Sequence, residues 1–300
     1  MSNLETLQKE PRSGLLKNYK LEFTPYLLLI PGLLWLITFF ILPILNLSTT
    51  STKTRSPSFE TGAFNQTWRF LNYVDAFVEN QEQFYRSFIY ALIATVLALA
   101  IAYPLAYAIA FRSGAMKNIL LVLVIAPFFT SFLLRTLAWK QILGSEGPVV
   151  SLLQNLNIMN SGQTITATSF SVIMGLTYNF LPFMTLPIYA SLDRIDPNLM
   201  EASGDLFANS LNTFRKVTLP LSMPGVVAGT LLTFIPASGD YINASILGNP
   251  NTKMIGNVID SRFFRVVDYP TAAALSFILM AVILIIVSVY IRRTGTDELV

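Results

Sequence analysis

Long apolar stretches alternate with polar segments along most of the chain. Six of these stretches reach the roughly 20 residues that an α-helix needs to cross a bilayer. They are Tyr26–Leu47, Ser87–Phe111, Ile119–Leu143, Ser169–Leu192, Val226–Leu247 and Thr271–Ile291. The pattern predicts an all-α, polytopic membrane protein in which residues 26–292 form a bundle of six transmembrane helices. Residues 1–25 and 293–300 are predicted to be short tails.

The composition supports an integral membrane protein. Of the 300 residues, 53% are hydrophobic and only 12% are charged, whereas a soluble domain averages about 25% charged residues. The basic residues behind the net charge of +3 are scattered, which argues against nucleic-acid binding. The chain contains neither Cys nor His, which excludes disulfides, thiolate or imidazole metal sites, and Cys- or His-based catalysis. No cofactor is expected.

The distribution of Lys and Arg predicts the orientation in the membrane, because short cytoplasmic loops carry an excess of these residues. If the N-terminus is inside, many basic residues lie on the inner side: Lys9, Arg12, Lys17, Lys20, Arg112, Lys117, Arg194, Arg215, Lys216, Arg292 and Arg293. The loop 144–168 on the outer side has no basic residue, and the basic residues of the long outer loop 48–86 weigh less. Both termini and residues 193–224 are therefore predicted to be cytoplasmic.

The outer loop 48–86 is also more than a connection, because it holds several aromatic residues. We expect these side chains to pack as a small cap on the membrane face: Trp68, Phe70, Tyr73 and Phe77.

The polar segment 193–224 is the most informative part of the chain. Pro197 stands where a first-turn proline opens a helix, and Glu201 and Asp205 follow one turn apart on one helix face. Leu206 and Phe207 form an apolar knob. A second short amphipathic helix is predicted to follow and to stop at Pro220 and Pro224. Two short helices with exposed apolar side chains favour a docking element over a plain connection.

The same segment resembles a known motif. Glu201-Ala202-Ser203, Asp205-Leu206 and Phe214–Gly225 are similar to the EAA loop of binding-protein-dependent ABC importer permeases. In that family the loop forms the coupling helix that sits in a cleft of a cytoplasmic ATPase. The resemblance assigns coupling to Glu201, Ala202, Ser203, Asp205, Leu206, Phe207, Leu219 and Pro220. Two positions depart from the family pattern: Phe207 replaces the usual Gly, and Ser203 replaces a second Ala.

Two further motifs narrow the resemblance. Ala126–Trp139 and Thr233–Tyr241 are similar to signatures of the spermidine/putrescine permeases of the PotB type. The resemblance implies a type I ABC importer permease-like bundle in a bacterial cytoplasmic membrane. It also implies a cytoplasmic ATPase dimer, a second homologous permease subunit of the PotC type, and an extracytoplasmic polyamine-binding protein.

Asp240 is a carboxylate within an apolar stretch, where it costs at least ~2.5 kcal/mol at the bilayer centre. One interpretation is that Asp240, with Tyr241, borders the translocation path and attracts a cationic substrate through charge and an aromatic face. The other is an ion pair with Arg135, Lys140 or a base of a partner subunit. Trp139 is either an interfacial anchor or a stacking surface in the path. Tyr178 either lines a cavity or takes part in helix–helix hydrogen bonding.

Missing motifs limit the other function classes. There is no G-x-x-x-x-G-K-[ST] phosphate loop, so an ATPase that drives transport must be another chain. A permease for another small organic solute and an ATP-independent secondary transporter remain as alternatives. A membrane enzyme or scaffold is less favoured, because no nucleophile has a suitable base and Asp240 is the one aspartate within an apolar stretch.

Overall fold

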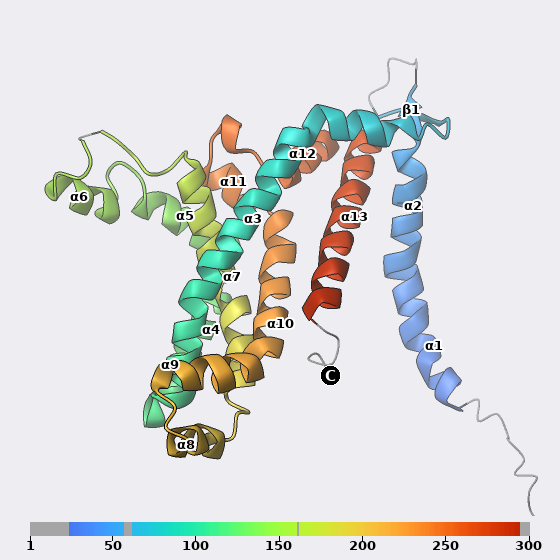
Figure 1. Cartoon of the computed structure of the whole chain (residues 1–300). Helices are drawn as coiled ribbons and strands as arrows, with labels where there is room; N and C mark the ends of the chain where they lie inside the picture. The colour runs from blue at the N-terminus through green and yellow to red at the C-terminus, as the bar shows by residue number, and fades with distance from the viewer. Residues whose placement is uncertain (1–23, 57–61, 161, 295–300) are drawn as a thin grey trace, which may run out of the picture. The chain divides into compact units, whose positions relative to one another are not determined.

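The computed structural model describes residues 24–56, 62–160 and 162–294. The chain divides into two units, residues 1–47 and 48–300 (Figure 1). The predicted tails at 1–25 and 293–300 lie almost entirely outside the described residues. The predicted bounds of the transmembrane domain remain a prediction.

A single helical run contains the first predicted span. It consists of α1 (Thr24–Leu36), a π-helical turn (Ile37–Ile41) and α2 (Leu42–Ser51). Residues Tyr26–Ser51 of this run are long and apolar enough to cross a membrane. The first span is thus about one helical turn longer than predicted.

Unit 2 includes the last residues of α2, then a small antiparallel hairpin, and its other regular elements are helical. In the hairpin, β1 (Lys53–Arg55) pairs with β2 (Phe64–Gln66), and Thr54 lies opposite Asn65. The helices are α3 (Leu71–Phe111), α4 (Lys117–Ile125), α5 (Phe132–Ile142), α6 (Pro148–Asn155), α7 (Ser169–Leu192), α8 (Pro197–Asp205), α9 (Ser210–Thr213), α10 (Leu219–Ser238), α11 (Ile242–Leu247), α12 (Ile255–Asp260) and α13 (Tyr269–Thr294). Short 3₁₀ turns occupy Gly114–Met116, Ala126–Phe129 and Pro250–Thr252, and π-helical turns occupy Phe214–Thr218 and Ser261–Arg265.

Small residues hold the centre of unit 2 together. The face that α3 turns towards α7 and α10 carries alanines three or four residues apart, all fully buried: Ala91, Ala94, Ala98, Ala102 and Ala106. On α10, a side chain at Gly225 would clash with the Pro187 carbonyl of α7, and one at Gly229 would lie 2.9 Å from the Met184 carbonyl. Small residues let transmembrane helices approach closely, so that packing supplies the attraction that lipid cannot.

The second predicted span is only part of α3, which begins 16 residues earlier, at Leu71. Hydropathy misses this first part because it is amphipathic: Ala76, Asn80 and Phe84, four residues apart, are buried on one face. The predicted aromatic cap is wrong for Trp68 and Phe70, which precede the helix and are largely exposed.

The third predicted span is a bent pair of helices. Gly114–Phe129 and Phe132–Ile142 meet at an angle of 97°, because Thr130 and Ser131 have extended backbones between them. The span predicted over Ile119–Leu143 is therefore interrupted by a bend at Thr130 and Ser131. Counting the bent pair as one, the described residues contain up to six spans.

The fifth predicted span is displaced towards the N-terminus. Residues Ser210–Ser238 form one helical run. The helix ends before Gly239 and Asp240, and α11 begins at Ile242. The prediction that Pro220 and Pro224 end a short helix is wrong, because the π-helical turn at Phe214–Thr218 and α10 are continuous. Pro220 lies in the first turn of α10 and Pro224 inside it, and the run changes direction between the segment labelled α9 and the upper part of α10 (Figure 1). By contrast, the fourth span, Ser169–Leu192, has the predicted bounds.

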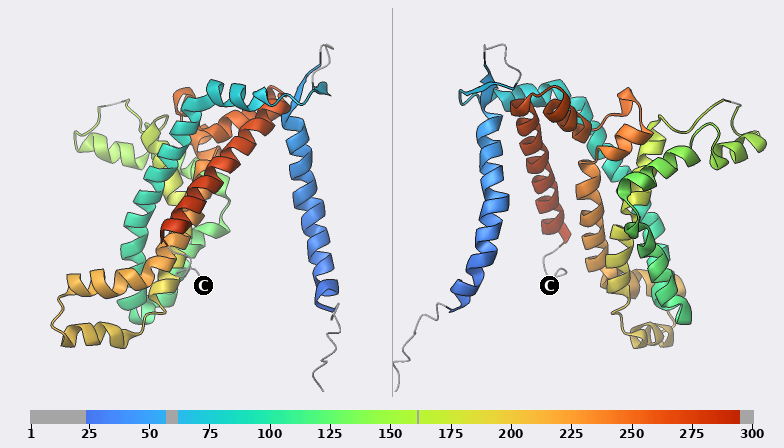
Figure 2. Two further views of the ribbon diagram at one scale, coloured as in Figure 1. Left: turned by 45° about the vertical axis from the view of Figure 1, so that its right-hand side comes forward. Right: turned by 180° about the vertical axis from the view of Figure 1, so that it is seen from behind.

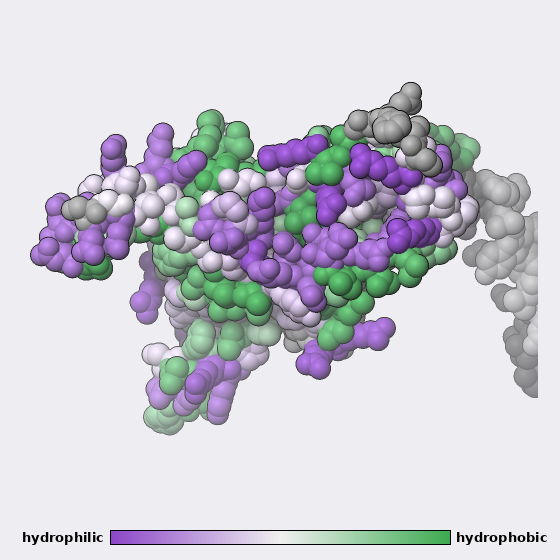
Figure 3. All heavy atoms as spheres, turned by 90° about the horizontal axis from the view of Figure 1, so that it is seen from above, coloured by the Kyte–Doolittle hydropathy of each residue, from purple (hydrophilic) through white to green (hydrophobic). Residues whose placement is uncertain are grey.

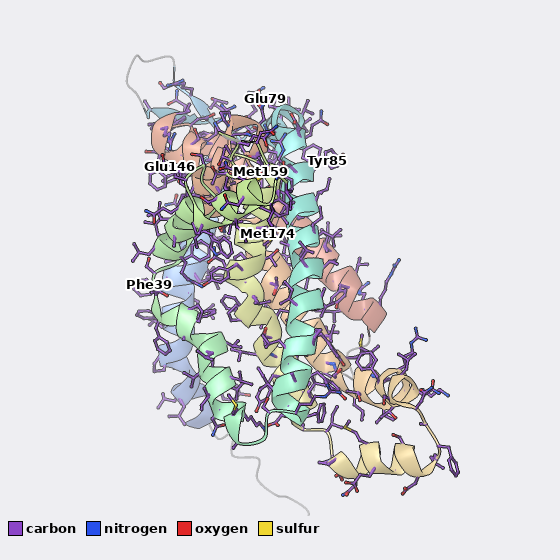
Figure 4. All side chains as sticks on the ribbon, turned by 90° about the vertical axis from the view of Figure 1, so that its left-hand side faces the viewer. Phe39, Glu79, Tyr85, Glu146, Met159 and Met174 are labelled. Carbon is purple, nitrogen blue, oxygen red and sulfur yellow. The ribbon has the colours of Figure 1, made fainter. Side chains whose placement is uncertain are left out.

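The two ends of unit 2 differ in what they present. The turn after α3 lies at the same end as α8 and α9, whereas the hairpin, α6, α11 and α12 lie at the other (Figures 1 and 2). In the view towards this second end, hydrophilic residues cover much of the surface (Figure 3). Glu79, Glu146 and Met159 mark this end, far from α8 (Figure 4).

Candidate functional site

The coupling segment predicted at residues 193–224 contains a well-capped short helix. Asp196 accepts a hydrogen bond from the Asn198 backbone N–H at 3.0 Å, and Pro197 occupies the first turn of α8. The prediction that Pro197 opens a helix is thus confirmed. The N-cap could have been recognised from the Asp-Pro pair, because Asp at the N-cap and Pro just inside the helix are both preferred.

The end of α8 is a Schellman motif, with Phe207 in the position that usually requires glycine. The Phe207 N–H donates to the Gly204 carbonyl at 2.9 Å, and the Ala208 N–H donates to the Ser203 carbonyl at 3.0 Å. Phe207 has a φ of 59°, in the left-handed region. Glycine is the usual residue here because a Cβ in this conformation costs roughly 1–2 kcal/mol. The replacement of Gly by Phe therefore leaves the expected bend intact but strained.

The predicted coupling residues differ in exposure and position. Most are exposed at the end of unit 2, on α8 or just after it: Glu201, Ala202, Asp205, Leu206 and Phe207. Ser203 is buried, and its hydroxyl lies 2.8 Å from the Thr213 hydroxyl of α9. This hydrogen bond joins the two helices, which gives a structural reason for serine in place of the family's alanine. Leu219 and Pro220 begin α10.

The second half of the segment packs on the bundle. The Phe214 ring meets the Tyr103 ring of α3 edge to face, with centroids 5.6 Å apart. Tyr103 also lies 2.8 Å from the Ser222 hydroxyl through its own hydroxyl, and Thr218 is fully buried. Phe214, an apolar residue of the second predicted short helix, is therefore part of the anchor that fixes α9 and α10 to α3.

An ion pair joins the start of the coupling segment to the third span. The Lys117 ammonium, at the first residue of α4, donates to the Asp193 carboxylate just after α7. Tyr189 donates to the same carboxylate at 3.2 Å, and the Lys117 nitrogen lies 5.5 Å from the Tyr189 ring centroid. Sequence reasoning did not find this pair, because residues 76 positions apart meet only through the packing of α4 on α7.

Asp240, the central residue of the predicted path, lies in the break between α10 and α11. It is 9% exposed, and its carboxylate accepts the Asn243 backbone N–H at 2.8 Å. Among the described residues Asp240 makes no ion pair, so the interpretation that it pairs with Arg135 or Lys140 is wrong. Tyr241 beside it is exposed, and its carbonyl accepts a hydrogen bond from the Asn257 amide at 2.8 Å.

A buried polar cluster connects this break to two other helices. Asn179 on α7 donates to the Asn243 side-chain oxygen at 3.0 Å and to the Thr136 hydroxyl of α5 at 3.1 Å. The Asn179 oxygen and the Asn243 amide nitrogen are buried and have no hydrogen-bond partner within the described part of the chain. Polar contacts of this kind join helices within a membrane, so the cluster fixes α11 and α5 against α7.

Trp139 and Tyr178, the other two predicted path residues, contact each other. Their rings are tilted by 65°, with centroids 5.2 Å apart. Tyr178 also borders an apolar cavity of about 290 Å³ between α3, α4 and α7, whose other lining residues are Leu105, Leu120, Leu123, Val124, Pro127, Leu181 and Pro182. Of the four predicted path residues, the structure thus brings Trp139 and Tyr178 into contact. Asp240 and Tyr241 are consecutive residues at the helix break, and Asp240 reaches Asn179, the residue after Tyr178, through Asn243.

Arg135 has an apolar environment. Its guanidinium carbon lies 5.5 Å from the Phe128 ring centroid and 5.6 Å from that of Phe132. Its Nε and Nη1 atoms are buried without a hydrogen-bond partner in the described chain. Aromatic faces attract a guanidinium, and these contacts replace the carboxylate that the sequence suggested. In the same described residues, no group of three or more Asp or Glu side chains is placed to hold a metal ion.

Comparisons with known proteins agree with the EAA-like segment. The family model described as "Binding-protein-dependent transport system inner membrane component" matches residues 102–294, more than half of the chain. The spermidine/putrescine transport system permease protein PotB of Haemophilus influenzae is 39% identical over 176 residues, which are 59% of this chain and 62% of that protein. PotB of Escherichia coli is 37% identical over 179 residues, 60% of this chain and 65% of that protein. Both matches span less than two thirds of the relative's length.

A solved structure agrees in fold. One chain of a bacterial alginate ABC transporter, crystallised with its alginate pentasaccharide-bound periplasmic protein, superposes with a TM-score of 0.69 at 19% identity. The alignment covers 95% of this chain and 98% of that chain. At this identity the likeness shows a shared fold, which confirms the predicted all-α, multi-pass, importer-permease-like fold class. Since the family model covers the end of α3 and all later helices, the chain belongs to the family of binding-protein-dependent transport system inner membrane components.

Proposed function

We propose that this chain is the pore-forming permease subunit of an ABC importer that moves spermidine or putrescine across a bacterial cytoplasmic membrane. The exposed helix α8, with Leu206 and Phe207 at its end, is the single observation that carries the mechanistic part of the proposal. The identity to PotB proteins supports the substrate class. The chain itself does no chemistry in this proposal.

The proposed ATPase contact is the exposed surface of α8. Glu201, Asp205 and the apolar pair Leu206 and Phe207 face away from the bundle, where a cytoplasmic ATPase would reach them. The contact from Phe214 to Tyr103 and the pair from Lys117 to Asp193 attach this surface to α3 and α4. A push on α8 is therefore passed to the spans, as alternating access driven by an ATPase dimer requires.

The proposed path borders on Asp240, Tyr241, Trp139 and Tyr178. Asp240 lies where the backbone leaves the helix, and irregular backbone at membrane depth is tolerated where it is buried in protein or lines a cavity. A carboxylate and aromatic faces suit a flexible chain of ammonium groups. A second, homologous permease completes the pore, and an extracytoplasmic binding protein delivers the polyamine.

Reconstitution tests the proposal. Proteoliposomes would hold this chain, its partner permease and the ATPase, with ATP on the ATPase side and the binding protein on the other. We expect ATP-dependent accumulation of labelled spermidine or putrescine, and none without the ATPase. Uphill transport by this chain alone would overturn the proposal. Accumulation of a different organic solute in place of polyamines would refute the substrate class and favour the alternative permease.

Charge reversal tests the docking surface separately. Glu201→Lys on α8 should release the ATPase or leave its hydrolysis uncoupled from uptake. Glu146→Lys is a matched control, because it makes the same exposed substitution at the opposite end of unit 2 (Figure 4). ATPase binding, measured in detergent, should survive in the control. Intact binding and intact coupled uptake in Glu201→Lys would contradict the assignment of α8.

A further inference from the structure

Phe207 combines two unfavourable features. Its φ of 59° places a bulky side chain in the left-handed region, which glycine adopts without a Cβ penalty. Its side chain is also 99% exposed, next to Leu206 at 81%. Glycine at position 207 would remove both the backbone strain and the exposed ring. Within the described residues no ring contact involves Phe207, so no aromatic packing in this part of the chain offsets either cost.

The surroundings of this apolar pair indicate what covers it. In Pro197–Phe207 the two charged residues are Glu201 and Asp205, and both are exposed. An anionic lipid surface attracts basic segments and would repel these carboxylates. A protein surface with an apolar pocket and basic residues around it fits both the ring and the acids, because interfaces combine apolar anchors with complementary charges.

We propose that Phe207 is a specificity-determining residue for the ATPase partner. Its ring inserts into an apolar pocket on the ATPase, and this pocket is larger than the one needed by permeases that carry glycine at the same position. The left-handed backbone of the Schellman motif directs the Phe207 ring away from α8. The backbone conformation therefore presents the ring to the ATPase. This inference rests on the proposed function, since it assumes that an ATPase docks on residues 193–224.

Affinity measurements on three versions of the chain test the inference. The chain, in nanodiscs with its partner permease, is titrated with the ATPase that supports ATP-dependent uptake in the reconstitution. Phe207→Ala removes the ring and keeps the left-handed strain, whereas Phe207→Gly removes both. If the ring fills a pocket, both variants bind about tenfold or more weakly than the natural chain, as truncated aromatic anchors do.

The pattern of results separates the inference from its foundation. If Phe207→Gly binds the ATPase as well as the natural chain, or better, the residue is only a strained cap and the inference is wrong. If the natural chain itself does not bind the ATPase, the proposed function fails instead. A second titration uses an ATPase whose own permease has glycine at this position. That ATPase should bind Phe207→Gly more tightly than the natural chain, and the opposite preference would also overturn the inference.

Discussion

Asp240 has a structural role that any test of its proposed role in the substrate path must preserve. The carboxylate accepts the Asn243 N–H at the start of α11, and Asn243 in turn contacts Asn179. Removing the side chain would therefore disturb the polar cluster as well as the charge. Asparagine keeps a capping oxygen, because Asn and Asp are similarly good at helix starts.

The substitutions Asp240→Asn and Asp240→Ala therefore separate the charge of the side chain from its capping hydrogen bond. Asp240→Asn should lower polyamine uptake about ten- to hundredfold, because hydrogen bonds to a charged group contribute ~1.5–3 kcal/mol. Its level in the membrane and its co-purification with the partner permease should stay normal. Asp240→Ala loses the cap as well and should reduce assembly. Uptake is measured with labelled spermidine, and unchanged uptake in Asp240→Asn would remove Asp240 from the path.

At the scale of the elements, the contact between α4 and the end of α7 joins two parts that must move together if α8 is a lever. Lys117, Asp193 and Tyr189 form a small network rather than an isolated pair. Isolated surface ion pairs add little stability, whereas networks and fixed geometry add more. Because Lys117 directly follows the turn between α3 and α4, the network also holds this turn close to the start of the coupling segment.

A charge swap tests this network without assuming transport. Lys117→Asp or Asp193→Lys alone places like charges together, so amide hydrogen exchange at residues 114–120 and 193–199 should become faster. The double variant restores opposite charges and should return exchange towards the natural rate. Exchange in the double variant that equals the sum of the two single effects would show that the two residues do not interact.

The elements also show how far the sequence could predict the fold. The fourth span was predicted with its observed bounds, since its apolar run ends at Asp193. For the third, hydropathy predicts a span but not its bend, which falls at Thr130 and Ser131, shortly after Pro127. The sequence predicts that a short helix ends at Pro220 and Pro224, because proline ends helices in soluble proteins. In this chain a π-helical turn leads directly into α10, and both prolines lie within one helical run.

For the candidate site, the sequence predicts individual residues but not the contacts between them. Apolar context singled out Asp240, and motif spacing singled out Glu201 and Phe207. The contacts between Asn243, Asn179 and Thr136 required knowing which helices are neighbours, and no local pattern gives that. Strain at Phe207 followed from the family's glycine only after the structure placed the residue in a left-handed turn.

On the scale of the whole molecule, the proposed function needs α8 on the cytoplasmic side, and the absence of Cys makes that orientation directly testable. A single introduced cysteine is the only thiol in the chain.

The two substitutions Asn212→Cys, within α9, and Asn155→Cys, at the end of α6, are both at exposed positions and lie at opposite ends of unit 2 (Figure 1). A membrane-impermeant maleimide added to spheroplasts should label Asn155→Cys at once. It should label Asn212→Cys only after the membrane is permeabilised. The asymmetry of Lys and Arg predicts this result, because basic residues are retained on the cytoplasmic side during insertion. The reverse labelling pattern would place α8 outside the cell, where no cytoplasmic ATPase can reach it. That result would refute the proposed role of α8 in coupling.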